Sequence, residues 1–400
     1  MRRSFAFKIT LLTLAWLLLA IACQQVPVRV FWPLAFGSLT TPLALAATAL
    51  LALYWLRRSW RVALLPLVAL VLTWPQVQRG LPVHLGGARA MKEEGMARAG
   101  LPASSFFVPH SKNDVSLLSA NVRIFNVYAE LREPGNASST GFIRWLAQSP
   151  ADVLCLQEFY NEPRGSRGDG AVFRAAEQLG ASGRHAFVSN TLTNSIGAEF
   201  GLAIFSRFPL VGRGTIWFSR RSQNHAMWAD LARPAAPGHR ADTFRVYNLH
   251  LQSMSMADAD LAAATQSRAG LRQKSPNLLR RFRNGAVARS TQVETVLAHV
   301  ARSPYPVLLA GDVNDLPYSY TYDQLADQLR TPGPPWAPAS GPPTTAGCPA
   351  CASTSSLPAR SGACWAARCT GKSSGATIFR WRACTSCAAE REEPHPVLLI

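Results

Sequence analysis

The residues best suited to metal or phosphate chemistry stand in the stretch PVLLAGDVNDLP, residues 306–317. Its apolar run, residues 307–310, has the length and composition of a buried strand, and Asp312, Asn314 and Asp315 follow it at once. Clustered carboxylate and amide oxygens at a strand end suit Mg²⁺ and can orient a water molecule toward a phosphate. On this stretch alone, an ordinary Asp/Asn turn that ends the strand explains the pattern equally well.

Three other polar residues stand at the ends of apolar runs. Asn121 ends SLLSAN, Glu158 ends DVLCLQE, and His250 ends VYNLH. Active sites gather where loops leave such strands. Asn121 and Glu158 are expected to hold one Mg²⁺ through their oxygens. Asp312 and Asn314 are expected to orient a water and a phosphate oxygen, and His250 to bind or protonate a phosphoryl oxygen. Each residue taken alone also suits an ordinary structural role.

The elements that must position these side chains are a mixture of strands and helices. Besides the runs that end at the polar residues, strand-like runs occur at 201–206 and 226–231. Helical spacing occurs at 141–149, 285–302 and 319–329. Strand-rich segments broken by a few helices predict an α/β protein with a two-layered sheet core and helices outside.

The run of motifs resembles the endonuclease/exonuclease/phosphatase superfamily, which includes pancreatic-type DNase, apurinic endonucleases, inositol polyphosphate phosphatases and bacterial sphingomyelinases. The matching pieces, in family order, are SLLSANVR, DVLCLQE, GLAIFSRFP, VYNLHLQS and LLAGDVNDLP, within residues 115–330. Each motif is weak by itself, but five in order are specific. Asn224 and Asp230, in NHAMWAD, match a subgroup pattern in sequence only, and their roles stay open.

The resemblance implies a four-layered α/β/β/α sandwich of the DNase type and hydrolysis of a phosphoester by an activated water, with Mg²⁺ or Mn²⁺. It implies that Asn121 and Glu158 bind the metal and that His250 contacts the scissile phosphate. It implies that Asp312 and Asn314 position the nucleophile and stabilise the transition state. A nuclease and a phosphodiesterase acting on phospholipid remain equally open.

The N-terminal region predicts a membrane anchor. Apolar segments at 9–23, 34–56 and 62–77 are expected to form three spanning helices. The basic residues in front of the first segment and at 57–61 would be cytoplasmic, which puts everything after residue 80 outside the cytoplasm. These spans are similar to those of a membrane-anchored bacterial subgroup, so the expected location is the inner membrane, with the lipid bilayer as a partner.

Two alternatives to this topology stay open. A cleaved signal peptide explains the first apolar segment, and two spans instead of three would place the catalytic domain in the cytoplasm. The expected organisation is an anchor at 1–80, a linker at 81–114, the family domain at 115–330 and a separate tail at 331–400.

The charge of the chain suits an anionic partner. It carries 41 Lys and Arg against 23 Asp and Glu, a formal net charge of +18. Nucleic acid and phospholipid are partners of this kind. A solvated basic surface explains the excess equally well. No obligate protein partner is implied.

Residues 331–400 depart from the family pattern. The resemblance implies an Arg-Ile-Asp strand followed by Ser-Asp-His, whose Asp-His pair would be the general base and a phosphate ligand. The tail contains no Asp and a single His, His395, and is rich in Pro, Ala, Ser, Thr and Cys. Two of its cysteine pairs, 348–351 and 384–387, have the CxxC spacing of a zinc ribbon.

A reading-frame slip just after Arg330 is the favoured interpretation of the tail, and zinc is not expected. If the third base of each codon is read with the first two bases of the next, allowed codons yield Arg-Ile-Asp and then Trp-Ser-Asp-His. The C-terminal strands are then expected to be missing or disordered. Loss of the base is expected to reduce activity by roughly 10²–10⁴-fold. The alternative function is a catalytically inactive, membrane-anchored binding protein that retains the fold.

Overall fold

The chain forms two compact units, which are described separately. The computed structural model describes residues 2–80, 114–128, 136–168, 170–219, 222–234, 242–254, 268–328, 364–373, 376–384 and 397–398. The helical unit comprises Met1–Gly87, Gln252–Thr295 and Val313–Gln328. The sandwich unit comprises Ala88–Leu251, Val296–Asp312 and Leu329–Ile400.

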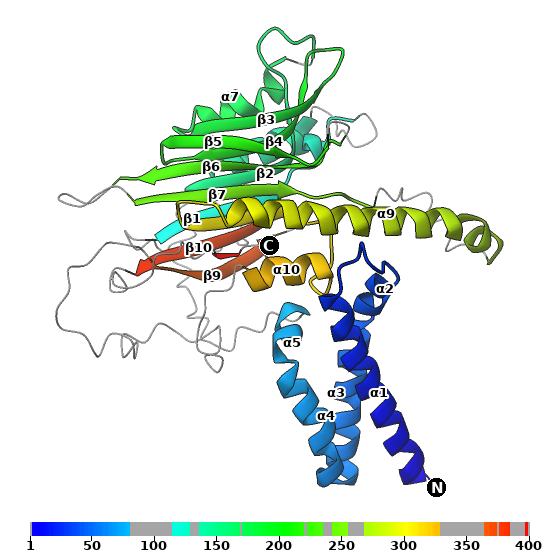
Figure 1. Ribbon diagram of the computed structural model, residues 1–400. Helices are drawn as coiled ribbons and strands as arrows, with labels where there is room; N and C mark the ends of the chain where they lie inside the picture. Colours follow the sequence, from blue (N-terminus) through cyan, green and yellow to red (C-terminus); the bar gives the residue numbers. More distant parts are fainter. Residues whose placement is uncertain are drawn as a thin grey trace, which may run out of the picture. The chain divides into compact units, whose positions relative to one another are not determined.

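The sandwich unit contains two β-sheets (Figure 1). Its strands are β1 Asp114–Asn121, β2 Val153–Asn161, β3 His185–Thr193, β4 Glu199–Ser206, β5 Leu210–Trp217, β6 His225–Arg233, β7 Asp242–His250, β8 Val307–Asp312, β9 Cys364–Ser373, β10 Ala376–Cys384 and β11 Val397–Leu398. One sheet has the order β3-β4-β2-β1-β10-β9 and the other has the order β11-β8-β7-β6-β5. The pairs β1–β2 and β7–β8 are parallel.

The main core lies between the sheets. Alternate residues of β1, β2 and β4, such as Leu117, Cys155 and Ile204, pack against alternate residues of β6, β7 and β8, such as Val246 and Ala310. The period of two follows from the pleat, which turns successive side chains to opposite faces.

Helices cover the outer faces of both sheets. A second core cluster joins α6 (Ala137–Gln148) and α7 (Ala175–Gly180) to the outward residues of β1, β2 and β4. On the other sheet, the end of α9 (Arg268–Val300) brings His299 within 2.7 Å of the Tyr247 hydroxyl. Short 3₁₀ turns occur at η3 Arg123–Asn126 and η6 Gly170–Phe173. The order helix, sheet, sheet, helix agrees with the DNase-like α/β class predicted from sequence.

All strands predicted from apolar runs are present, but two strands within residues 115–330 were missed. β3 and β5 each lie at the edge of a sheet and consist mostly of half-buried and exposed residues. An edge strand that is covered on one face has no continuous apolar run, so a pattern of consecutive apolar residues does not reveal it.

The C-terminal strands, which were expected to be missing or disordered, are present as β9, β10 and β11. β10 pairs antiparallel with β1, and β9 pairs with β10. Without β10, β1 would expose a row of unpaired backbone groups next to a buried core, which is costly. The cysteine pairs proposed for zinc include Cys348, Cys351 and Cys387, which lie outside the described residues.

The helical unit contains the N-terminal helices and α10. Its helices are α1 Arg2–Gln25, α2 Leu34–Leu39, α3 Thr41–Arg58, α4 Trp60–Leu72, α5 Trp74–Gly80, α10 Tyr320–Gln328 and the part of α9 up to Thr295. Val28 and Ala35 form a small core with Ala286 of α9 and Tyr320 of α10. Two polar contacts tie the N-terminal helices to α10: Gln25 and Arg79 both bind Asp323, at 2.6 and 2.8 Å.

The prediction of three membrane spans is wrong. Among the described residues, one helix is long and apolar enough to cross a membrane, Ser4–Gln25. The second predicted span breaks near Thr40, and α3 has about 24 Å of helix before Arg57 and Arg58. The third ends at Leu72, and its 13 residues extend about 20 Å. A bilayer core is about 30 Å thick.

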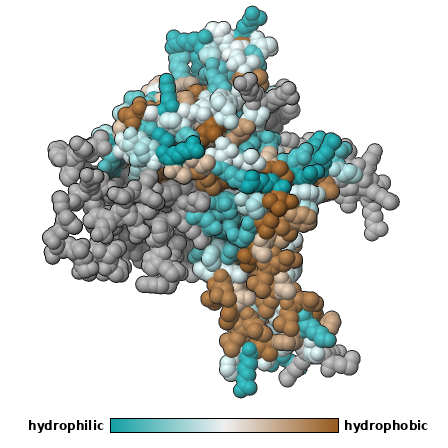
Figure 2. Space-filling view, in the orientation of Figure 1, coloured by the Kyte–Doolittle hydropathy of each residue, from teal (hydrophilic) through white to brown (hydrophobic). Residues whose placement is uncertain are grey.

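Apolar side chains nevertheless cover the outside of these helices. Figure 2 shows hydrophobic surface over α1, α3 and α4. Large apolar residues are more than half exposed on each of them, for example Leu12 on α1, Leu50 on α3 and Val71 on α4. A continuous apolar surface of this kind marks a contact with a membrane or another protein.

Candidate active site

The candidate site lies where strands of the two sheets end. In one sheet, Asn121 at the end of β1 is paired with Gln157 of β2, one residue before Glu158. In the other sheet, His250 at the end of β7 is paired with Asp312 at the end of β8. Because both pairs are parallel, their carboxyl ends share an edge of each sheet.

Four of the five predicted site residues meet at this edge. The Asn121 amide nitrogen donates to Glu158 Oε1 and to Asp312 Oδ2, both at 2.9 Å. His250 Nε2 lies 3.8 Å from Glu158 Oε1 and 4.0 Å from Asp312 Oδ2. The side chains of Glu158 and Asp312 are 37% and 28% exposed, so a ligand can reach both carboxylates.

The fifth predicted residue, Asn314, belongs to the helical unit, so its place relative to the other four is not described. Its backbone has φ +53°, in the left-handed region. Asn tolerates this region better than most residues, which suits its place in the tight loop after β8.

The backbone of Glu158 has a similar distortion. Its φ is +50°, and the pairing of β2 with β4 shifts register between Leu156 and Phe159. Two residues of β2 therefore oppose one residue of β4, which is a β-bulge. A non-glycine residue in the left-handed region costs roughly 1–3 kcal/mol and persists where packing enforces it. The bulge redirects the chain at the metal-ligand candidate itself.

A buried polar pair beneath the site was not predicted. The Gln157 amide donates to Asn248 Oδ1 at 2.6 Å, and Asn248 donates to the carbonyls of Leu156 and Ala203. Both side chains are almost fully buried. The signal in the sequence was a polar residue inside each of two apolar runs. Gln157 stands one position before Glu158, and Asn248 stands two positions before His250.

A second histidine lies opposite His250. His225 begins β6, and in the register between β6 and β7 it pairs with His250. His225 is fully buried and stacks on Trp217. Burial lowers the pKa of His225 to about 4, although its contact with the Gln223 carbonyl acts in the opposite direction. His225 is therefore neutral at ordinary pH.

The two residues left open by the sequence have structural partners. Asn224 donates to the carbonyl of Leu251 at 3.0 Å and so holds the residue after His250. Asp230 forms a buried, two-point ion pair with Arg245, at 2.6 and 2.9 Å. Arg245 also lies over the Trp228 ring. Arg245 stands five residues before His250 in β7.

The donor chemistry at the site fits a hard divalent cation. Two carboxylates and one amide converge, and Mg²⁺ prefers such oxygen ligands. Within the described residues, no group of three His, Cys, Asp or Glu side chains is already arranged around a metal position. Asn121 turns its nitrogen toward both carboxylates, and rotation of the amide would present oxygen instead.

Carboxylates, an amide and a histidine gathered at the strand ends of a two-sheet sandwich are chemically suited to a hydrolase. The family comparison agrees: residues 118–357 match the model of the Endonuclease/Exonuclease/phosphatase family, and the chain belongs to this family. The match continues beyond the boundary at residue 330 predicted from sequence. Residues 2–80 match a domain of unknown function, DUF8431. No curated protein matches the chain.

Solved structures of low identity share parts of the fold. The human Nocturnin catalytic domain with bound sulfate is 16% identical, with a TM-score of 0.36, over 53% of this chain and 69% of that one. An endonuclease/exonuclease/phosphatase from Beutenbergia cavernae is 19% identical, with a TM-score of 0.38, over 68% and 72%. A mutant of beta toxin from Staphylococcus aureus with bound magnesium ions is 14% identical, with a TM-score of 0.33, over 55% and 71%.

Proposed function

We propose that the chain is a Mg²⁺-dependent phosphoesterase of the nuclease or phosphodiesterase type. The observation that carries this proposal is the convergence of Asn121, Glu158, His250 and Asp312 within 4.0 Å contacts at one edge of the sandwich. A hydrolase is what the family's name describes. The metal and the substrate class are the parts that experiment must test.

Each of the five residues is assigned a role, the first four from their contacts and Asn314 from its place in the sequence. Glu158 and Asn121 hold the cation, which polarises the phosphoryl oxygen when bound. His250 donates a hydrogen bond to a phosphoryl oxygen, because its Nε2 faces the same space as both carboxylates. Asp312 accepts a hydrogen bond from the attacking water and orients it. Asn314, two residues later, donates to the developing negative charge.

The chain reaches its substrate from a membrane surface. α1 is the anchor, and the exposed apolar side chains of the helical unit contact lipid. Arg2, Arg3 and Lys8 precede the apolar part of α1 and favour a cytoplasmic N-terminus. With one crossing, the sandwich unit lies outside the cytoplasm, where phospholipid and nucleic acid are both available substrates.

The tail in its present frame lacks the general base. The described strands β9, β10 and β11 contain neither Asp nor His. In the shifted frame, the Asp codon straddles residues 376 and 377 and the His codon straddles 377 and 378. Backbone register supports the slip, because Ala376 pairs with Ala120, next to Asn121. The shifted Asp-His pair would thus enter the sheet at the edge that carries the site.

The test compares the chain as it stands with a restored-frame chain, in which one base is added near the Arg330 codon. Both are purified in detergent and assayed with a bis-ester reporter, DNA and phospholipid vesicles, with Mg²⁺ and with EDTA. The restored-frame chain is expected to hydrolyse at least one substrate only with Mg²⁺, and the present chain roughly 10²-fold or more slowly.

Two controls make this test decisive. Asp312→Asn in the restored-frame chain is expected to abolish the Mg²⁺-dependent rate, which rules out a contaminating hydrolase. Absence of any Mg²⁺-dependent cleavage by the restored-frame chain would refute the enzymatic proposal and favour the binding protein. Sequencing the gene tests the slip separately: a continuous frame without the alternative reading would refute it.

A further inference from the structure

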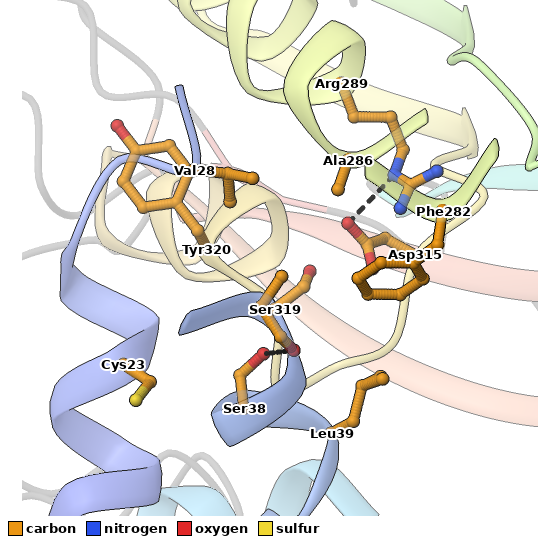
Figure 3. Close-up of a pocket in the computed structure, with 11 residues that line it drawn as sticks. Cys23, Val28, Ser38, Leu39, Phe282, Ala286, Arg289, Asp315, Ser319 and Tyr320 are labelled. Carbon is orange, nitrogen blue, oxygen red and sulfur yellow. Dashed lines mark hydrogen bonds and ion pairs between the residues drawn. The ribbon is translucent and has the colours of Figure 1, made fainter. Parts of the chain in front are cut away.

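Arg289 of α9 is the most deeply buried charged side chain near the loops that follow β7 and β8. It is 1% exposed. Its Nε donates to Asp315 Oδ2 at 2.9 Å, and its Nη1 donates to the carbonyl of Gln252 at 3.0 Å. Figure 3 shows Arg289 and Asp315 facing each other. One guanidinium therefore binds two segments that lie far apart in the sequence.

Both segments continue directly from site residues. Gln252 is two residues after His250, and Asp315 is three residues after Asp312. The amide nitrogen of Gln252 donates to Gln292 Oε1 at 2.9 Å, so α9 holds this backbone at both its N–H and its C=O. The geometry makes α9 a clamp on the two loops that leave the strands bearing His250 and Asp312.

The ion pair is largely shielded from water, because the side chains of Arg289 and Asp315 are 1% and 12% exposed. The pair lies in the wall of an open pocket. The remaining wall combines apolar side chains with two serines and a tyrosine: Cys23, Val28, Ala35, Ser38, Leu39, Phe282, Ala286, Ser319 and Tyr320. In such surroundings a charge-assisted hydrogen bond is stronger than at an exposed surface, and an unpaired charge is more costly.

We propose that Arg289 is a positioning residue for the phosphoesterase site: it fixes the loops after His250 and Asp312 through Gln252 and Asp315. The inference rests on the proposed function for its consequence in catalysis. Its second effect is electrostatic, because Arg289 neutralises Asp315. Without Arg289, the Asp315 carboxylate would lose its cationic partner, and the loop that carries Asn314 would be released.

The test uses the restored-frame, full-length chain with three substitutions. Arg289→Met removes both bonds, Arg289→Lys keeps the charge but loses the planar fork that reaches two partners, and Asp315→Asn keeps the shape without the charge. The matched control is Arg245→Met, which also breaks a buried Arg–Asp pair but at a distance from the site. Steady-state kinetics and amide hydrogen exchange of residues 250–254 and 311–316 are measured.

Arg289→Met is expected to lower kcat about 10²-fold with a change in KM of about threefold or less, since misplacement by about 1 Å has that effect. The kcat values of Arg289→Lys and Asp315→Asn are expected to lie between those of Arg289→Met and the parent. Exchange in both loops is expected to rise, whereas Arg245→Met destabilises the protein with kcat and loop exchange unchanged.

Parent-like kcat and loop exchange in Arg289→Lys and Asp315→Asn would overturn the inference, and so would equal effects of Arg245→Met and Arg289→Met. If Arg289→Met does not fold, the two milder variants decide. Hydrogen exchange needs no activity. An inactive parent with fast exchange only in the Arg289 and Asp315 variants would therefore refute the proposed function but keep the clamp.

Discussion

Gln157 and Asn248 connect the two sheets directly beneath the candidate site, with 2.6 Å between Gln157 Nε2 and Asn248 Oδ1. Each is next to a site residue or nearly so: Gln157 precedes Glu158, and Asn248 is two positions before His250. Hydrogen bonds between buried amides are directional, whereas the apolar contacts around them are not. This pair therefore sets how the two halves of the site face each other.

Removal of both partners should cost less than the sum of the two single removals. Gln157→Leu leaves Asn248 Oδ1 unsatisfied in the core and is expected to destabilise the protein by about 1–3 kcal/mol. Gln157→Leu with Asn248→Leu is expected to cost less than the sum of the single changes. Urea unfolding of the four proteins measures this coupling. Strictly additive losses would show that the pair does not act as a unit.

The left-handed backbone at Glu158 predicts a conflict between stability and activity. Glu158→Gly relieves a φ of +50° that glycine adopts freely, so melting temperature is expected to rise by the equivalent of about 1 kcal/mol. The same change removes a carboxylate of the site and should abolish Mg²⁺-dependent hydrolysis. Glu158→Gln, which keeps the strain, serves as the control. A lower melting temperature for Glu158→Gly than for Glu158→Gln would contradict this account.

Cation binding should be visible in stability without any assay of activity. Mg²⁺ relieves the repulsion between the Glu158 and Asp312 carboxylates, so saturating Mg²⁺ is expected to stabilise the native chain, by about 2.7 kcal/mol at 100 times Kd. EDTA should reverse the shift. Asp312→Asn should reduce it, while Asp242→Asn, at the other end of β7, should retain it. An equal shift in all three proteins would mean that Mg²⁺ binds elsewhere.

The buried His225 predicts acid lability. Its pKa is about 4 in the folded state and 6.5 when unfolded, so protonation favours unfolding. The stability that the neutral ring contributes is complete above pH 6.5 and is lost as pH falls from 6.5 toward 4, by up to about 3 kcal/mol. His225→Phe preserves stacking on Trp217 without titration. Urea unfolding between pH 7 and pH 4 should show a shallower loss for this variant, and parallel curves would contradict the prediction.

The apolar surface of α1 predicts attachment to lipid. Leu12 is 70% exposed, and Leu12→Arg should weaken flotation of the chain with phospholipid vesicles, because a central charge costs about 2.5–3.5 kcal/mol in a membrane helix. Leu192→Arg changes an exposed leucine of β3 and is the matched control. Equal flotation of the two variants would contradict a role for α1 in anchoring.

The amino-acid pattern was enough to locate the strands that carry the site and the residues at their ends. β1, β2, β7 and β8 are buried on both faces, so their apolar runs are continuous, and the polar residue that ends each run is conspicuous. Local pattern sufficed because these features occupy a few consecutive residues. Local hydropathy overestimated the number of membrane spans, because it does not show where a helix breaks.

How those residues are held together depends on contacts between distant parts of the chain. The bulge at Glu158 depends on the register between β2 and β4, and the Gln157–Asn248 pair joins residues 91 positions apart. Arg289 reaches Gln252 and Asp315 across separations of 37 and 26 residues. Such contacts are set by packing of elements that are distant in the chain, and no local pattern of residue types encodes which buried polar groups will meet.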